Sequence, residues 1–285
     1  MIQVFINGLL LGANYALLGL GYTLVFGVMH LLTLAHGEVF MAAGLVALLL
    51  AASGTPIWLA GLYAVVVGAL LSALTDVVSF RPVGYRRPIA AAVSTIGFAL
   101  VIQNALLQVR GSSTAVAVPF SIPRGDLEVA GLLISLTQAL SLAVATVVLA
   151  ATHQFVRGTR WGMAMRAFAH DAETVALLGV PVRRLTLITL LMAGALAGVA
   201  SYLLAIRTGS VSPFAGLEVG LKGLAIMTIG GLGSLPGAMI AGVGLGLIES
   251  FAAYLGLTGF QAAVPWMLLI VVLLVRPQGL VRAGA

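Results

Sequence analysis

The stretch Leu185–Ile206 reads LTLITLLMAGALAGVASYLLAI and contains no charged side chain. Arg183 and Arg184 precede it, and Arg207 follows it directly. A helix needs about 20 mostly apolar residues to cross the hydrocarbon core of a membrane. This stretch meets that requirement, so it predicts a transmembrane helix with arginines at both of its ends.

Apolar stretches of this kind recur from one end of the chain to the other. The expected segments are Ile2–Val28, Leu34–Ala52, Ile57–Ser79, Pro88–Val109, Ala130–Val156, Leu185–Ile206, Val219–Gly231, Gly237–Leu255 and Phe260–Val275. Val219–Gly231 is short for a crossing and could instead form a half-helix or a re-entrant segment. We therefore expect an all-α, polytopic bundle of about eight or nine transmembrane segments, in a single membrane domain over residues 1–285.

The composition excludes a soluble enzyme. Hydrophobic residues make up 61% of the chain and charged residues only 8%, whereas soluble domains carry about 25% charged residues. Because cysteine is absent, disulfides, thiolate metal sites and cysteine nucleophiles are excluded as well. The net charge of +6 comes from basic residues scattered between apolar segments, which indicates membrane orientation and not nucleic acid as a partner.

The arginines predict how the chain is oriented. They fall in three groups that alternating crossings place on one side: Arg81, Arg86 and Arg87; Arg157, Arg160, Arg166, Arg183 and Arg184; and Arg276 and Arg282. Only Arg110, Arg124 and Arg207 fall on the opposite side. Since basic loops stay in the cytoplasm, the C-terminus is expected there and the N-terminus outside. The first apolar segment has no basic region before it and should remain as a helix.

Residues 157–184 form the one long polar stretch on the expected cytoplasmic side. Its apolar residues recur every three or four positions, as on one face of an amphipathic helix: Trp161, Ala164, Met165, Phe168, Ala172, Val175 and Ala176. Gly179 suits the position just after a helix, and Pro181 follows as a stop. This helix could rest on lipid or contact a partner protein.

Polar residues mark two interrupted apolar segments. His36 and Glu38 stand at the start of one, where they could be functional or could cap a helix. Glu218 and Lys222, the only lysine, are spaced to pair on one helix, and the glycine-rich run Gly230–Gly237 then breaks it. Interrupted membrane helices indicate a transport path, so we expect both breaks to face a shared cavity.

Four blocks along the chain resemble one family. They are GYTLVFG (21–27) with Ala35-His-Gly-Glu, RWGMAMRAFAHDAETVALLGV (160–180), GLEVGLKGLAIMTIGGLGSLPGAM (216–239) and VRPQGL (275–280). In this order they are similar to the permeases of ATP-binding-cassette (ABC) importers for branched-chain amino acids. The family often has Asn where this chain has Thr33.

The resemblance implies a bacterial inner-membrane permease subunit that imports branched-chain amino acids or a related small amide or carboxylate. It implies four kinds of partner: a second related permease, two cytoplasmic ATPase subunits that bind ATP and Mg²⁺, a periplasmic solute-binding protein, and lipid. The expected ATPase-coupling residues are Arg160, Gly162, Arg166, Asp171, Ala172, Glu173 and Gly179. The expected path residues are His36, Gly37, Glu38, Glu218, Lys222, Gly233 and Ser234.

Two other classes of function are weighed against this one. A stand-alone secondary transporter or channel needs ionisable groups inside the membrane, and Glu38, Asp76, Glu218 and Glu249 are candidates. An enzyme is disfavoured, because the four histidines form no metal-spaced pair and no catalytic Ser–His–acid order stands out. We expect no metal and no cofactor on this chain.

Overall fold

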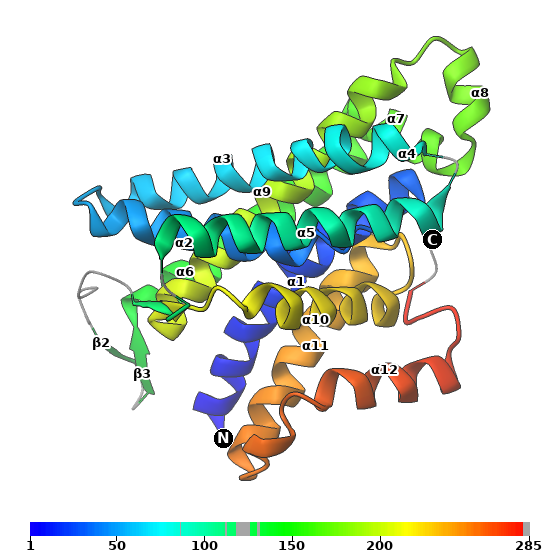
Figure 1. Ribbon diagram of the computed structural model, residues 1–285. Helices are drawn as coiled ribbons and strands as arrows, with labels where there is room; N and C mark the ends of the chain where they lie inside the picture. The colour runs from blue at the N-terminus through cyan, green and yellow to red at the C-terminus, as the bar shows by residue number, and fades with distance from the viewer. Residues whose placement is uncertain (86, 112, 118–125, 130–131, 282–285) are drawn as a thin grey trace.

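The structure is a computed structural model that describes residues 1–85, 87–111, 113–117, 126–129 and 132–281 (Figure 1). Its helices are α1 (Ile2–Met29), α2 (His36–Ala52), α3 (Ile57–Thr75), α4 (Arg81–Val83), α5 (Pro88–Arg110), α6 (Leu136–Gly158), α7 (Arg160–His170), α8 (Ala172–Leu177), α9 (Val182–Thr208), α10 (Ala215–Gly230), α11 (Leu235–Tyr254) and α12 (Val264–Val275). A π-helix (Asp76–Phe80) joins α3 to α4, and a 3-10 helix (Thr258–Phe260) precedes α12. Two short antiparallel pairs join β1 (Val116–Ala117) to β4 (Ser210–Val211) and β2 (Asp126–Val129) to β3 (Leu132–Ser135).

The predicted helical membrane bundle is confirmed. Six helical stretches of the described chain are long and apolar enough to cross a membrane: Ile2–Met29, Ile57–Val83, Pro88–Val109, Thr137–Gly158, Val182–Thr208 and Leu235–Tyr254. The other three expected segments form shorter helices, with 17 residues in α2, 16 in α10 and 12 in α12. At 1.5 Å per residue they reach about 18 to 26 Å, less than the roughly 30 Å hydrocarbon core. The count of eight or nine crossings therefore stays a prediction.

Two expected segments begin several residues later than predicted. The segment Ala130–Val156 begins as helix only at Leu136, because the preceding residues pair as strand β3 with β2. The segment Phe260–Val275 begins as α12 only at Val264, with a proline in its first turn. Proline fits there because the amide N–H that it lacks has no partner inside the helix at that position.

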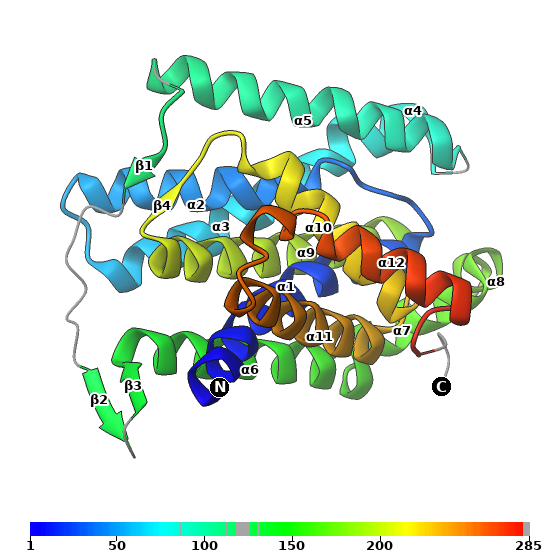
Figure 2. The same ribbon diagram turned by 90° about the horizontal axis from the view of Figure 1, so that it is seen from below.

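Helix α1 is the centre of the bundle. Of its most apolar stretch, 89% is buried, whereas the corresponding share for α6 is 22%. Figure 2 shows α1 between the other helices, with α5 at one side of the bundle and α6 at the opposite side. The side chains Leu17, Leu18, Leu20 and Tyr22 of α1 are almost completely buried. The outer helices leave their apolar side chains exposed, as lipid-facing helices do.

Glycines let α1 and α11 approach closely. A Cβ atom added at Gly246 would come within 2.2 Å of the Gly12 backbone nitrogen, and one at Gly242 within 2.5 Å of the Ala16 backbone. Helices in lipid associate through such close packing, because the hydrophobic effect no longer drives them together.

We expect Gly246→Ala to lower the melting temperature of the purified protein, because the new methyl group meets backbone that cannot move aside. Overpacking of this kind costs about 1 to 3 kcal/mol. Gly244→Ala is the matched control on the same helix, since no described atom lies within 4 Å of the Cβ that it adds. Equal melting temperatures for the two variants would contradict the close approach of α1 and α11.

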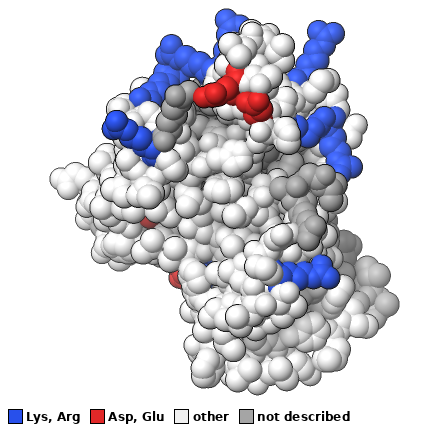
Figure 3. All heavy atoms as spheres, turned by 90° about the vertical axis from the view of Figure 1, so that its right-hand side faces the viewer, with Lys and Arg blue, Asp and Glu red and all other residues white. Residues whose placement is uncertain are grey.

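The basic side chains gather at one end of the bundle, which we call the arginine-rich end. It consists of α4, the end of α6, α7, α8 and the start of α9, and Figure 3 shows its basic and acidic side chains together. In Figure 1 this end lies to the upper right, away from the start of α1. Arg86, Arg124 and Arg282, which were used to predict orientation, lie outside the described residues.

Candidate functional site

An ionic cluster joins three helices inside the bundle. The Lys222 ammonium on α10 lies 3.5 Å from a Glu218 carboxylate oxygen one turn earlier, which confirms the predicted pairing. It also lies 3.4 Å from a carboxylate oxygen of Glu249 on α11. The Tyr15 hydroxyl on α1 donates a hydrogen bond to Glu249 at 2.7 Å and accepts one from Lys222 at 3.2 Å. The cluster thus fixes α1, α10 and α11 relative to one another.

Exposure changes steeply across this ionic cluster. The Glu249 side chain is 5% exposed, that of Lys222 is 14% exposed, and that of Glu218 is 68% exposed. Phe214, the residue just before α10 and four positions before Glu218, is also exposed. A carboxylate inside a membrane protein faces water or other protein and not lipid, because its transfer into hydrocarbon costs several kcal/mol. The Glu218 face of α10 is therefore suited to a polar surrounding that the chain itself does not provide.

The first break places His36, Gly37 and Glu38 against the first turns of α10. A Cβ atom at Gly37 would come 2.2 Å from the Gly216 carbonyl oxygen, and one at Gly216 would come 2.4 Å from the Glu38 carboxyl carbon. Only glycines allow this contact. His36 is 2% exposed and meets the ring of Tyr22 edge-on, with 4.6 Å between ring centroids.

Buried polar atoms without a hydrogen-bond partner lie where α2 and α10 begin. Within the described part of the chain, His36 Nε2 and one oxygen of Glu38 are buried and have no hydrogen-bond partner. The N-termini of helices present unpaired N–H groups and a partial positive charge. This junction thus holds unsatisfied donors and acceptors at the level of the bundle core, beside the exposed face of Glu218.

The second break lies at the arginine-rich end. Gly231 and Gly233 adopt φ values of +108° and +83°, which other residues rarely adopt, and the Ser234 hydroxyl accepts a hydrogen bond from the Gly237 amide at 3.2 Å. The chain after α12 returns here: the amides of Leu280 and Val281 donate to the last carbonyls of α10 at 2.9 and 3.0 Å. The tail that carries the last family-like block, VRPQGL, therefore packs on this break.

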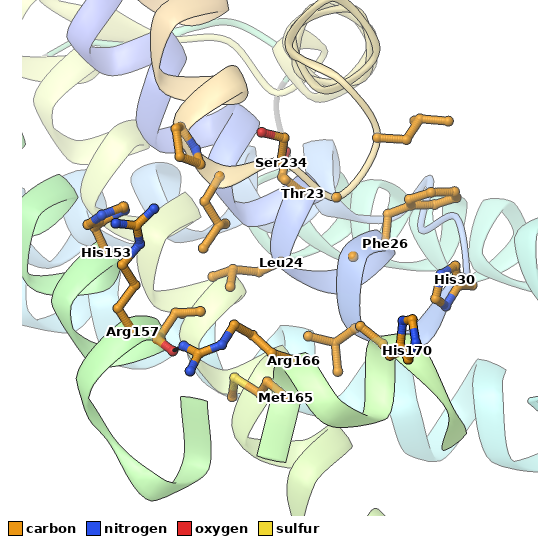
Figure 4. A pocket seen from close by; sticks show the side chains of 18 residues that line it. Thr23, Leu24, Phe26, His30, His153, Arg157, Met165, Arg166, His170 and Ser234 are labelled. Carbon is orange, nitrogen blue, oxygen red and sulfur yellow. Dashed lines mark hydrogen bonds between the residues drawn. The ribbon is translucent and has the colours of Figure 1, made fainter. Parts of the chain in front are cut away.

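The expected cavity shared by both breaks stays a prediction, because the cavity at the second break does not reach the first. Gly233 and Ser234 line a cavity of about 610 Å³ at the arginine-rich end (Figure 4), but His36 and Gly37 do not line it. Gly37 instead packs on Gly216 and Gly220, at the opposite end of α10. The 16 residues of α10 separate the two breaks.

The expected single amphipathic helix is two helices, α7 and α8. Trp161, Met165 and Phe168 on α7 pack into the chain's own core beside Val25 and Leu185. Met165 is buried there and Trp161 and Phe168 are partly buried, so the chain's own core covers much of this apolar face. Gly162 cannot carry a side chain, because a Cβ there would meet the Val156 carbonyl oxygen at 2.3 Å, and the guanidinium of Arg166 donates to that same carbonyl. Gly162 and Arg166 thereby fasten α7 to the end of α6.

Asp171 starts α8. Its carboxylate accepts hydrogen bonds from the Glu173 and Thr174 amides at 3.0 Å each and from the Thr174 hydroxyl. α8 ends before Gly179, whose φ of +80° confirms the predicted position after a helix. Two adjacent apolar side chains project outward at this end, Leu177 with 88% and Leu178 with 76% exposure. Arg160, Ala172 and Glu173 are exposed as well.

We expect Asp171→Ala to speed hydrogen exchange at the Glu173 and Thr174 amides, whereas Asp171→Asn, which can still cap the helix, should not. Donors from Thr174 and the backbone hold the pKa of Asp171 below its usual range. The charged cap should therefore persist at neutral pH and be lost as the pH falls through that lowered pKa. Exchange that is equal in both variants would contradict the cap.

The four membrane carboxylates weighed for ion coupling are mostly paired. Asp76 is fully buried and bonds Arg81 at 2.6 Å and the Tyr85 hydroxyl at 2.5 Å. Glu218 and Glu249 share Lys222. The sequence analysis missed Tyr15, Leu177 and Leu178. A single lysine in an apolar helix needs a negative partner on another helix. This requirement could have pointed to Glu249 and to Tyr15 beside it.

The chain is similar in sequence to known permeases along nearly its whole length. Residues 4–274 match the family model described as the permease component of the branched-chain amino acid transport system. The BraD permease protein of Pseudomonas aeruginosa, from a high-affinity branched-chain amino acid transport system, is 33% identical over 98% of this chain and 95% of its own length. The LivH permease protein of Escherichia coli is 34% identical over 98% of this chain and 94% of its own.

Two solved structures share the fold. A transporter described as of the metal-chelate ABC type, in an inward-facing conformation, aligns with a TM-score of 0.53 and 14% identity over 96% of this chain and 83% of its own. PsaBC from Streptococcus pneumoniae aligns with a TM-score of 0.55 and 12% identity over 97% of this chain and 92% of its own. At these identities the likeness concerns the fold alone.

Proposed function

Because the chain belongs to the family of branched-chain amino acid transport system permease components, we propose that it imports branched-chain amino acids or a related small amide or carboxylate. It is a membrane permease subunit of an ABC transporter, and ATP hydrolysis resides in separate subunits. The observation that carries the substrate proposal is the 33 to 34% identity to BraD and LivH along 98% of the chain. ATP and Mg²⁺ belong to the ATPase partners in this proposal.

The transport path runs along the Glu218 face of α10. This face carries a charge that lipid does not accommodate, so a second, related permease covers it and a wet path lies between the two chains. An amino acid is a zwitterion, and Glu218 with Lys222 offers one charge of each sign, 3.5 Å apart. Glu218 would take the substrate ammonium and Lys222 the carboxylate, while Glu249 and Tyr15 hold Lys222 in place.

The first break completes the path beside this pair. His36 and Glu38 bring buried polar atoms to the start of α10, where helix N-termini meet. Gly37 keeps the two helices in contact. Gly233 and Ser234 would lie at the far end of the same helix, toward the arginine-rich end.

The coupling element is α8 with its flanks. Leu177 and Leu178 would enter a groove on an ATPase subunit, while Arg160, Asp171 and Glu173 would meet polar groups at its rim. Gly162 and Arg166 act indirectly, since they fasten α7 and thereby position α8. Gly179 ends the element with a backbone conformation that suits glycine. The arginine-rich end is then cytoplasmic and the N-terminus external, in line with the positive-inside rule.

Affinity purification of the tagged chain from its bacterial inner membrane in mild detergent tests the assembly. Two ATPase chains and one related permease are expected to co-purify, and a solute-binding protein is expected to associate when substrate is present. If two copies of this chain co-purify with the ATPase chains and no related permease is found, the permease pair is a homodimer. A lone, monodisperse protein would contradict the assembly and favour a stand-alone secondary transporter.

A further inference from the structure

The cavity at the arginine-rich end is lined by basic side chains. It has a volume of about 610 Å³, within the range of small-molecule sites, and it lies between α1, the end of α6, α7 and the Gly231–Ser234 turn. Its titratable lining residues are His30, His153, Arg157, Arg166 and His170 (Figure 4). No Asp or Glu of the described chain lines it. Five basic groups from three separate helices or their ends line it.

Contacts within the described chain use only some of the hydrogen-bonding atoms of these basic side chains. Arg166 donates to the Val156 carbonyl, but a guanidinium carries five N–H donors and one such bond leaves others available. The Nδ1 atom of His153 is buried and has no hydrogen-bond partner in the described chain. The nearest carboxylate in sequence, Asp171, is bound to the first turn of α8. The cavity therefore lacks an anion that would balance its charge.

The start of α11 adds to the positive potential. Ser234 and Pro236 line the cavity, and the 20-residue helix α11 begins at Leu235. The N-terminus of a helix carries a partial positive charge and favours phosphate and carboxylate groups. The helix start and the five basic side chains thus favour the same kind of ligand.

We propose that this cavity binds a phosphate-bearing anion, supplied by the head group of an anionic phospholipid or by a soluble phosphate. Basic pockets between membrane helices bind such head groups at the cytoplasmic side. Arg157 and His170 reach the phosphate from the end of α6 and the end of α7, and Arg166 adds donors from the middle of α7. Occupancy ties the Gly231–Ser234 turn to α6 and α7, which already pack on each other through Gly162 and Arg166.

The ligand would act on the element next to it. α7 lines the cavity on one face and leads directly into α8, so an anion held by Arg166 and His170 restrains the start of α8. This site is separate from the Glu218–Lys222 pair, which lies on α10, a helix that contributes no residue to the cavity.

The test is thermal unfolding of the purified full chain in a neutral detergent, titrated with phosphatidylglycerol, phosphatidylcholine or inorganic phosphate. A ligand that binds the folded state raises the melting temperature with concentration. For Arg157→Gln the half-saturating concentration of the stabilising anion should rise about fivefold, as expected for the loss of one basic group. His170→Gln, at an exposed position, is the second site variant. Arg184→Gln, at the same end but outside the cavity, is the control and should match the unmodified protein.

The three titrations separate the outcomes. Stabilisation by phosphatidylglycerol alone assigns the cavity to a lipid head group, and stabilisation by inorganic phosphate as well assigns it to a soluble anion of the same chemistry. Equal stabilisation by phosphatidylcholine would overturn anion recognition. Identical titrations for Arg157→Gln, His170→Gln and Arg184→Gln would overturn the assignment to this cavity.

Discussion

Lys222→Met should destabilise the protein by about 3 to 5 kcal/mol, the usual cost of removing one member of a buried ion pair. The reason is that Glu249, which is 5% exposed, would be left as a buried carboxyl group without its cationic partner. The melting temperature in detergent should fall, and the amount of protein in the membrane should fall with it.

The double variant Lys222→Met, Glu249→Gln separates the charge from the shape of the side chains. It removes both buried charges and should recover most of the lost melting temperature, because no uncompensated carboxylate remains. Glu218→Gln is the matched control: Glu218 is largely exposed and pairs with the same lysine, so its loss should change stability little. If Glu218→Gln and Lys222→Met destabilised the protein equally, the buried arrangement of Glu249 would be contradicted.

Leu177→Asp should reduce ATP-dependent uptake at least about tenfold while the permease still inserts and folds. Leu177 is 88% exposed, so the fold loses little packing when it is replaced. In the proposed docking groove, however, a buried carboxylate would replace an apolar anchor, and such anchors carry most of the binding energy of an interface. Uptake and co-purification of the ATPase subunits are the two measurements.

Leu257→Asp is the control for this second prediction. Leu257 is also an exposed leucine, but it follows α11 at the end of the bundle opposite the arginine-rich end. Its variant should insert, assemble and transport normally. Normal uptake by Leu177→Asp would show that α8 is not part of the coupling element. An equal loss of uptake in both variants would point to a general effect of the added charge.

Composition and apolar run length were sufficient to predict the membrane bundle, because lipid demands long apolar helices wherever the chain crosses. Local signals also placed Gly179 after a helix and paired Glu218 with Lys222, and the structure agrees on both. The break at Asp171 was missed, since the apolar period continues from Phe168 to Val175 across it. The capping preference of aspartate was the stronger signal there.

Contacts between distant segments explain what the sequence left undetermined. Tyr15 and Glu249 are 234 positions apart, and no local motif around either residue predicts that they pair. The apolar face of α7 has the same spacing whether it meets a partner, lipid or the chain's own core. Periodicity identifies an apolar face, but only the packing of Met165 beside Val25 and Leu185 shows what covers it.

The transport path along α10 is tested most directly by thiol labelling, because the chain has no cysteine of its own. Glu218→Cys in the assembled transporter should react with a water-soluble, membrane-impermeant thiol reagent. Ile240→Cys, at a 56% exposed position within the membrane helix α11, should stay unlabelled because lipid covers it. A Glu218→Cys variant that is as unreactive as Ile240→Cys would contradict a wet path on this face of α10.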